Sequence, residues 1–404
     1  MKNRHTLILL LTLTAVIFQG CLINSIDDVS FGTARPSTKT PIVAAYLQIG
    51  SRKLNVSELN LQGVNFVNLA FTTIKNNRIG FLYPNDANNF RVARKLKRKY
   101  PAIKVLVSVG GANTSALFSD LVSSKQNRDI FVEDAVKFVR SYGLDGIDID
   151  WEFPGLKKAT RNSDRTNFTA LISELKTALN TAGITDGKKY YLTIASGAFK
   201  YYLDYVEPIK LACLVDYFHI MTYDFYGQWN DITGHHANLF PSELKPAGYS
   251  VRNITELYIK SGIPREKIII GAAFYGRKWK HVPPANHGLY EKGKGVGSIN
   301  YRNIKALLAN RNSGFTKYWD TKASAPYLYN STSQTFISYE DTCSVLRKTN
   351  YAYINQLGGI MYWEHFSDCD GELSGTIIRQ AGFLKKDIPL FRLPGGLMLY
   401  ARNK

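Results

Sequence analysis

Short runs of apolar and β-branched residues alternate along most of the chain with longer amphipathic stretches. Eight of these runs have the length and composition of buried strands: residues 42–47, 64–71, 104–109, 146–151, 190–196, 215–223, 268–274 and 359–363. Apolar residues at helical spacing lie between most of them and after the last, as in residues 88–99, 129–142, 165–182, 251–262 and 372–384. Strands that alternate with helices imply a parallel sheet, and eight repeats close a (β/α)8 barrel.

One interval departs from this rhythm. About 80 residues, from Gly276 to Leu357, separate the seventh and eighth expected strands. They contain a helical pattern at residues 301–310 and short alternating runs near residues 315–319 and 326–338. We therefore predict an α/β fold: a (β/α)8 TIM barrel over residues 41–388 with a small α+β insertion, at about residues 279–345, between strand 7 and strand 8.

The N-terminus has the pattern of an export signal. Lys2 and Arg4 precede a largely apolar, uncharged run over residues 6–18, and Gly20-Cys21 follows. This pattern predicts a signal peptide over residues 1–20 that is too short to span a membrane. We therefore expect a secreted protein. Gly20-Cys21 is also similar to a bacterial lipoprotein cleavage box, which would attach an acylated Cys21 to a membrane; simple secretion is the alternative.

The remaining terminal segments and the cysteines suggest little chemistry. Residues 21–40 are Ser/Thr-rich and are typical of a tether, and residues 389–404 form an apolar, basic C-terminal tail. With Cys21 at the cleavage point, an odd number of cysteines remains, so no disulfide framework is implied. A Cys343–Cys369 disulfide is one option, and we expect Cys213 to be buried. No Cys/His spacing resembles a metal site, and we expect no metal and no cofactor.

Composition and charge narrow the function further. The aromatic content of 13%, with 25 Tyr and 21 Phe, is high and suits a cleft that stacks on sugar faces. The net charge of +19 raises the question of nucleic acid, but the cations are dispersed and no nucleic-acid-binding motif accompanies them. Their densest run, residues 91–99, is typical of the solvated face of one helix. We therefore predict no nucleic-acid binding.

Three acids occupy alternate positions of the fourth expected strand, namely Asp148, Asp150 and Glu152. Because side chains alternate across a strand, the three share one face, which in a barrel is the interior. The residues between them are large and apolar, which disfavours the alternative of a solvated edge strand. Glu152 comes last, and barrel active sites lie at the C-terminal ends of strands. We predict that Glu152 is a general acid, with an anionic Asp150 behind it.

The run Asp145-Gly-Ile-Asp148-Ile-Asp150-Trp-Glu152 matches the D-x-x-D-x-D-x-E signature of glycoside hydrolase family 18, the chitinases and their relatives. Four further stretches resemble motifs of that family in the same order: Ser108-Val-Gly110-Gly111, Met221-Thr-Tyr223-Asp224, Phe274-Tyr275-Gly-Arg277 and Gly359-Ile-Met-Tyr-Trp363. Many members also carry an α+β subdomain after strand seven. The chain thus resembles this family over nearly its whole mature length.

The resemblance implies hydrolysis of β-1,4 linkages between N-acetylglucosamine units, in which the 2-acetamido oxygen of the substrate attacks its own anomeric carbon. Glu152 would protonate the glycosidic oxygen, Asp150 would stabilise the acetamido group, Asp148 would share a proton with Asp150, and Tyr223 would steady the acetamido oxygen. The remaining implied substrate-binding residues are Asp145, Tyr46, Phe71, Gly110, Gly111, Trp151, Met221, Asp224, Trp229, Tyr275, Arg277 and Trp363.

Chitin or N-acetylglucosamine oligosaccharides are the expected partners of a protein that we expect to be a monomer. Ala112 stands where many chitinases have a tryptophan, so the cleft lacks one stacking platform, and soluble chains are favoured over crystalline chitin. An endo-β-N-acetylglucosaminidase acting on N-glycans, or a peptidoglycan-directed relative, is the alternative. A non-catalytic chitin-binding lectin is disfavoured by the presence of Glu152.

Overall fold

The computed structural model describes residues 40–156, 161–384, 391–392 and 398–399. The predicted signal peptide, the tether up to residue 39 and most of the predicted tail lie outside the described residues. Export, lipidation of Cys21 and the monomeric state therefore stay predictions. The described residues between 40 and 384 form one compact unit. In a second unit, strands β15 (Phe391–Arg392) and β16 (Met398–Leu399) pair in antiparallel orientation.

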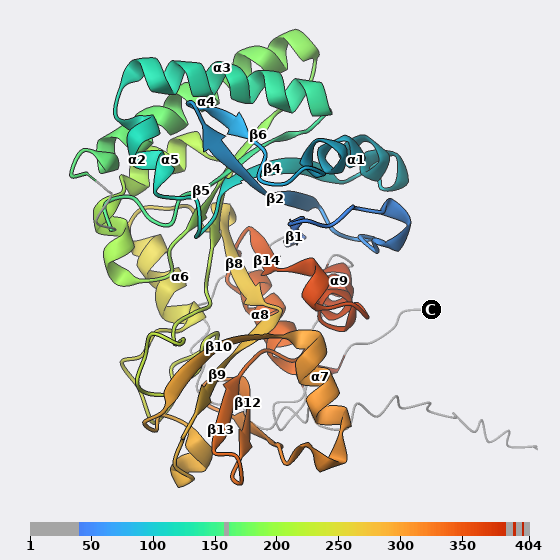
Figure 1. Cartoon of the computed structure of the whole chain (residues 1–404), viewed down its shortest axis with the longest axis vertical. Helices are drawn as coiled ribbons and strands as arrows, with labels where there is room; N and C mark the ends of the chain where they lie inside the picture. Colours follow the sequence, from blue (N-terminus) through green and yellow to red (C-terminus); the bar gives the residue numbers. More distant parts are fainter. Residues whose placement is uncertain (1–39, 157–160, 385–390, 393–397, 400–404) are drawn as a thin grey trace, which may run out of the picture. The chain divides into compact units, whose positions relative to one another are not determined.

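Eight parallel strands close into a barrel in the larger unit (Figure 1). Each barrel strand pairs with the next, and the last pairs with the first through Gly359 and Ile42. The strands are β1 (Ile42–Gln48), β2 (Phe66–Lys75), β4 (Lys104–Gly110), β5 (Gly146–Asp150), β6 (Tyr191–Ser196), β7 (Tyr217–Ile220), β8 (Ile268–Ala273) and β14 (Gly359–Trp363). The predicted (β/α)8 TIM barrel is confirmed. The short β3 (Arg78–Gly80) pairs with the end of β2.

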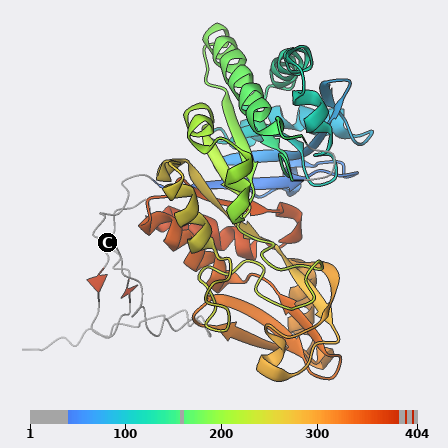
Figure 2. The same ribbon diagram turned by 90° about the vertical axis from the view of Figure 1, so that its left-hand side faces the viewer.

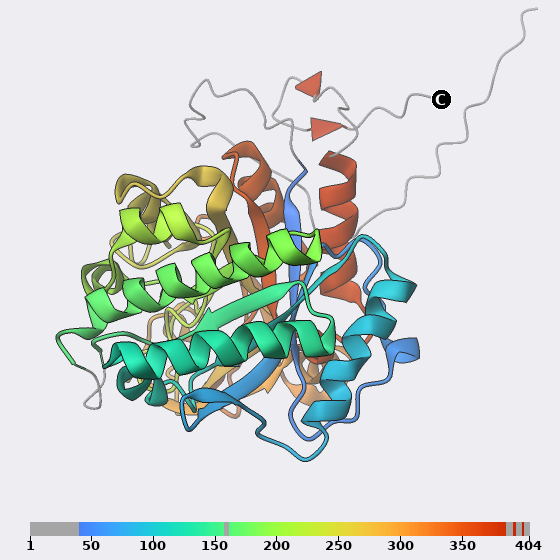
Figure 3. The same ribbon diagram turned by 90° about the horizontal axis from the view of Figure 1, so that it is seen from above.

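Helices cover the outside of the barrel, and Figure 3 shows α3 and α4 running side by side across it. The Ser124 side chain caps α3 by accepting from the amide of Asn127, and Gly143, with a φ of 67°, ends it. The sequence pattern misses α2 and α5, because six or seven residues are too few to show helical periodicity. The barrel helices are α1 (Asp86–Lys99), α2 (Leu117–Val122), α3 (Lys125–Tyr142), α4 (Asp164–Asp186), α5 (Pro208–Leu214), α6 (Val251–Lys260), α8 (Thr342–Ile354) and α9 (Glu372–Leu384).

The insertion forms an α+β lobe between β8 and β14, drawn in orange in Figures 1 and 2. Its antiparallel sheet has the order β10-β9-β13-β12-β11 and a core of its own around Trp279 and Phe336. The lobe begins at Tyr275 and ends before α8, which packs on β8 and β14 as a barrel helix. Its elements are β9 (Tyr275–Lys280), β10 (Lys294–Asn300), α7 (Tyr301–Ala309), β11 (Thr316–Asp320), β12 (Ala325–Asn330) and β13 (Thr335–Ser338).

The cysteines differ from expectation. Cys213 is an exposed free thiol, because the short helix α5 turns it away from the barrel. Cys369 is also a free, exposed thiol, so a Cys343–Cys369 disulfide is not formed. Among the described residues, no helix is both long and apolar enough to cross a membrane.

Candidate active site

Strand β5 carries Asp148 and Asp150 on the inner face of the barrel and ends immediately before the loop with Glu152. The two aspartates are 0% and 3% exposed, whereas Glu152 is half-buried at the C-terminal mouth. Ile147 and Ile149 point the other way and join the hydrophobic layer between strands and helices. The period of two thus separates a row of acids from a row of apolar side chains.

The Asp148 carboxylate is held by hydroxyl groups from three other strands. Its Oδ1 accepts from Thr193 on β6 at 2.6 Å. Its Oδ2 accepts from Ser108 on β4 at 2.7 Å and from Tyr46 on β1 at 3.0 Å. Three hydroxyl groups from neighbouring strands therefore fix the position and orientation of the Asp148 carboxyl group inside the barrel.

Asp150 has the opposite environment. Its buried Oδ1 has no hydrogen-bond partner among the described residues. Burial first, and then the neighbouring carboxylates of Glu152 and Asp148, raise the pKa of Asp150 well above its ordinary value. This environment favours the protonated form of Asp150, whereas the sequence led us to expect an anionic Asp150.

Gly110 and Gly111 let β4 approach the end of β5 closely. A Cβ on Gly110 would lie 2.1 Å from the carbonyl oxygen of Asp150, and the φ of Gly110 is 115°. The amide of Gly111 donates to that same oxygen at 2.8 Å. Ser115 Oγ then accepts from the amide of Glu152 at 2.8 Å. The two glycines and Ser115 therefore set the position of the backbone that carries Glu152.

Aromatic side chains surround the acids. Trp363 is partly exposed and lies between Phe71, stacked at 5.3 Å, and Tyr46 at 5.9 Å between ring centroids. Tyr223 and Met221 pack against the same interior cluster. Burial is the largest cause that raises the pKa of Tyr223 well above its ordinary value, followed by the nearby carboxyl group of Asp150, so the Tyr223 hydroxyl keeps its proton as a donor. The site thus combines an apolar aromatic surface around Trp363 with the hydroxyl group of Tyr223.

Asp224 and Arg277 form an ion pair at the edge of this wall. Arg277 donates from Nε to Oδ1 at 2.7 Å and from Nη2 to Oδ2 at 2.5 Å. Burial alone would raise the pKa of Asp224, but His236 and Arg277 outweigh it and lower the pKa to about 2. The Arg277 guanidinium also lies 5.0 Å over the ring of Trp229 and 5.2 Å over that of Tyr275. Trp229 is 57% exposed and presents its ring to solvent.

Two of the implied substrate-binding residues lie elsewhere. Asp145 precedes β5 at the opposite end of the barrel, roughly 20 Å along the strand direction from Glu152. Its carboxylate accepts from the amide of Val105 at 2.9 Å and pairs with Lys97 at 2.6 Å. Trp151 is 2% exposed and packs toward the helices, stacked on Phe118 at 5.4 Å. Both substrate-binding predictions are therefore corrected: these two side chains stabilise the barrel.

Several residues around Asp148 were not predicted from the sequence. Thr193 comes from the neighbouring strand, and its hydroxyl reaches Asp148 only through the register of the sheet. His219 on β7 is fully buried, and its Nδ1 lies 2.8 Å from the Tyr46 hydroxyl. Burial lowers the pKa of His219, which keeps the imidazole neutral. A lone histidine in an apolar strand is the only signal that the sequence offered for it.

The described residues contain no group of three or more His, Cys, Asp or Glu side chains placed to hold a metal ion.

Comparison with known proteins gives a consistent result. The model of Glycosyl hydrolases family 18 matches residues 42–368. Chitinase A1 of Niallia circulans is 38% identical over 322 residues, which cover 75% of this chain and 45% of that protein, so the chain spans about half the length of this relative. A family 18 N-acetylglucosaminidase structure from Paenibacillus barengoltzii is 36% identical, with a TM-score of 0.77 and coverage of 84% and 99%. Chitinase ChiA74 from Bacillus thuringiensis is 30% identical, with a TM-score of 0.80 and coverage of 85% and 70%.

Proposed function

Because the chain belongs to the glycosyl hydrolases of family 18, we propose that it hydrolyses β-1,4 linkages between N-acetylglucosamine units of chitin or chitooligosaccharides with retention of configuration. One observation supports the mechanism above all. Asp148 with its three hydroxyl donors, Asp150 with a raised pKa, and Glu152 just beyond the end of β5 follow one another toward the mouth. Such a row can deliver a proton and then support a positive charge.

Glu152 protonates the glycosidic oxygen in this proposal and later removes a proton from the incoming water. Neither Asp148 nor Asp150 acts as the nucleophile in this proposal. The acetamido oxygen of the substrate supplies that nucleophile and forms an oxazolinium ion, which is the substrate-assisted exception among retaining enzymes. The reaction in this proposal needs the proton of Glu152, the fixed backbone that carries Glu152 and the acetamido oxygen of the substrate as the nucleophile.

Asp150 and Tyr223 hold the acetamido group. The unpartnered Oδ1 of Asp150 can accept the acetamido N–H, and the Tyr223 hydroxyl can donate to its carbonyl oxygen. As positive charge develops, the proton of Asp150 can move toward Asp148, whose three hydroxyl donors must then rearrange little. Preorganised groups of this kind stabilise a transition state because they need no reorganisation during the reaction.

Aromatic surfaces hold the sugar rings. The face of Trp363 forms the floor beneath the reacting sugar, bordered by Tyr46, Phe71 and Met221. Trp229 serves as a platform on the leaving-group side, and Arg277 backs its ring. The absence of an aromatic side chain at Ala112 favours soluble oligosaccharides as substrates.

The variant Glu152→Gln tests the proposal. We expect hydrolysis of N-acetylglucosamine oligomers to fall by several orders of magnitude while oligomer binding is retained, because only the proton donor is removed. Glu133→Gln, at an exposed acid on α3, is the matched control and should be fully active. Unchanged turnover by Glu152→Gln would contradict the proposal, and indifference to a thiazoline analogue of the oxazolinium ion would contradict substrate assistance.

A second candidate is release of single N-acetylglucosamine units, favoured by the 36% identity to the Paenibacillus barengoltzii N-acetylglucosaminidase. Product analysis on chitotetraose separates the two, because disaccharides indicate chitinase action and monosaccharides indicate the alternative. A high-mannose glycopeptide, incubated in parallel, tests whether the protein acts on N-glycans. A peptidoglycan fragment tests whether it acts on peptidoglycan.

A further inference from the structure

Strand β8 extends beyond the end of its neighbour β7 at the mouth of the barrel. The two strands last pair through Ile270 and Ile220. On its other side, β8 remains paired with β14 as far as Ala273. Backbone groups of alternate residues in a strand point to the same neighbour, so Gly271 and Ala273 both face the place where β7 is missing. Buried backbone groups require partners, and these two must find them outside the sheet.

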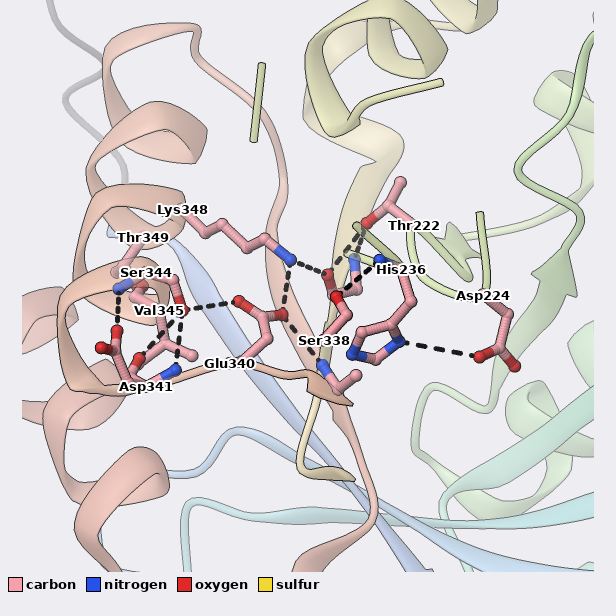
Figure 4. Close-up of polar contacts among 12 residues, drawn as sticks. Thr222, Asp224, His236, Ser338, Glu340, Asp341, Ser344, Val345, Lys348 and Thr349 are labelled. Carbon is pink, nitrogen blue, oxygen red and sulfur yellow. Dashed lines mark hydrogen bonds and ion pairs between the residues drawn. The ribbon is translucent and has the colours of Figure 1, made fainter. Parts of the chain in front are cut away.

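Three side chains take the place of the missing strand (Figure 4). Thr222 Oγ1 accepts from the amide of Gly271 at 2.7 Å and donates to its carbonyl oxygen at 2.9 Å. Glu340 Oε1 accepts from the amide of Ala273 at 3.1 Å. Lys348 Nζ lies 3.5 Å from the carbonyl oxygen of Gly271. The free edge of β8 is therefore sealed by polar side chains: Glu340 lies between β13 and α8, and Lys348 lies on α8.

Glu340 and Lys348 form an ion pair with side chains only 1% and 0% exposed. The carboxylate also accepts from Ser344 Oγ at 2.9 Å. Desolvation makes a buried ion pair expensive, and apolar side chains of similar volume are often as stable. An apolar pair could not, however, provide an acceptor for the amide of Ala273. The bond to that amide is the specific property of Glu340.

The sealed edge lies directly against the catalytic tyrosine. Ala273 and Tyr275 share a small buried cluster into which Tyr223 and Trp363 pack. A Cβ on Gly271 would lie 2.8 Å from the ring of Tyr223. With contacts this close, a displacement of residues 271–273 would displace the Tyr223 ring as well.

The end of β13, two residues before Glu340, also holds the turn that follows Tyr223. Ser338 Oγ accepts from the amide of His236 at 2.9 Å, and the carbonyl oxygen of His236 accepts from Phe225 at 3.1 Å. The His236 ring lies beside Asp224, with 3.7 Å between Nδ1 and Oδ1 (Figure 4). One side of the turn at Tyr223 and Asp224 is thus attached to Ser338 through His236, and the other side contacts the edge of β8, where Glu340 binds the amide of Ala273.

We propose that Glu340, held in place by Lys348, is a positioning residue for the hydrolysis: its carboxylate fixes the amide of Ala273 and thereby the place of Tyr223 against the bound sugar. The reaction named here rests on the proposed function. The placement of the β8 edge does not depend on it.

Two double variants distinguish the role of Glu340 as hydrogen-bond acceptor for the amide of Ala273 from the role of its charge in the pair with Lys348. In E340Q/K348M, the glutamine oxygen still accepts from Ala273 and its amide can donate to Ser344, so we expect kcat within about threefold of the wild type. In E340L/K348M, the volume is similar but the acceptor is lost. We expect kcat to fall by on the order of ten- to a hundredfold with little change in KM, because misplacement of a group that acts in the transition state lowers kcat. Equal kcat values in the two variants would overturn the proposal.

A Tyr223→Phe background tests whether the effect passes through the tyrosine. If it does, adding E340L/K348M to Tyr223→Phe lowers kcat by less than about twofold, because residues that act through each other are not additive. A full multiplicative loss would overturn the proposal. Should E340L/K348M fail to fold, E340D replaces it: the shorter carboxylate keeps Lys348 paired but withdraws from Ala273, and an unchanged kcat would count against positioning.

Hydrogen exchange of the peptide covering residues 271–275 gives a readout without substrate. We expect faster exchange in E340L/K348M than in E340Q/K348M, and equal exchange in the two would overturn the proposal. If the wild type hydrolyses no N-acetylglucosamine oligomer, the proposed function fails, and the exchange result still decides whether Glu340 fixes the edge of β8.

Discussion

Replacing Asp224 by asparagine isolates the electrostatic contribution of the Asp224–Arg277 pair. The variant keeps the size of the side chain and removes the charge that Arg277 binds through two hydrogen bonds. The pKa of Asp224 falls from 3.8 to about 2 on folding, and one pKa unit corresponds to about 1.4 kcal/mol. The ionised carboxylate therefore stabilises the fold by about 2 kcal/mol near neutral pH.

The pH dependence of this contribution has a definite sign. Because the folded-state pKa of Asp224 lies below the unfolded-state pKa, the unfolded chain binds more protons between about pH 4 and pH 2. The stabilisation is complete above the unfolded-state pKa and is lost as the pH falls through the folded-state pKa. We expect the free energy of unfolding of the wild type to decline by about 1 kcal/mol more than that of Asp224→Asn between pH 6 and pH 3.

Urea unfolding at low ionic strength, followed by tryptophan fluorescence at intervals between pH 3 and pH 7, measures this difference. Asp129→Asn is the matched control, because Asp129 forms an exposed pair with Lys125 on α3, and exposed pairs contribute little. Its unfolding curve should parallel that of the wild type. If the curves of Asp224→Asn and the wild type also run parallel over this range, the reasoning about Arg277 and His236 is wrong.

Three further predictions concern the close backbone contact at the end of β4, an open glycine position in α9 and the exposed ring of Trp229. Gly110→Ala should lower the free energy of unfolding by several kcal/mol and impair activity, since the new methyl would lie 2.1 Å from the Asp150 carbonyl oxygen. Gly382→Ala in α9, where nothing lies within 4 Å, should instead stabilise by about 0.5 to 1 kcal/mol in thermal unfolding. Trp229→Ala should weaken chitooligosaccharide binding by about 1 to 3 kcal/mol in calorimetry, by analogy with stacking of bases on aromatic rings. Equal affinity would remove Trp229 from the substrate platform.

The sequence predicted the barrel well because its strands are dense in β-branched and apolar residues, which leave little ambiguity between strand and helix. Strand β10 escaped prediction because its sequence, Lys-Gly-Val-Gly-Ser-Ile-Asn, contains two glycines and only two strong strand formers. Helix α8 escaped because it continues directly from the insertion. Local sequence patterns identify helices and strands, but they do not show whether an element belongs to the barrel or to the insertion.

The inward direction of Asp148 and Asp150 and the place of Glu152 at the mouth could be predicted from the sequence. Side-chain alternation and the end of a strand can both be recognised within one short segment. The errors at Asp145 and Trp151 arose from the same segment: both have the opposite parity from Asp148 and Asp150, so alternation alone places them outside the barrel. The hydroxyl groups of Ser108 and Thr193 reach Asp148 only through the pairing of β5 with its neighbours. Pairing register is a property of the closed sheet and cannot be read from any one strand.

The place of the insertion between β8 and β14 also governs when the barrel can form. β1 and β14 pair through residues about 320 positions apart, so the seam between them closes only after the whole insertion has been synthesised. Contacts this distant in sequence slow folding, because the chain loses the entropy of a long loop before the new contact stabilises it. Until β14 is in place, one edge of β1 therefore has no partner, and such an edge can pair with a second copy of the chain.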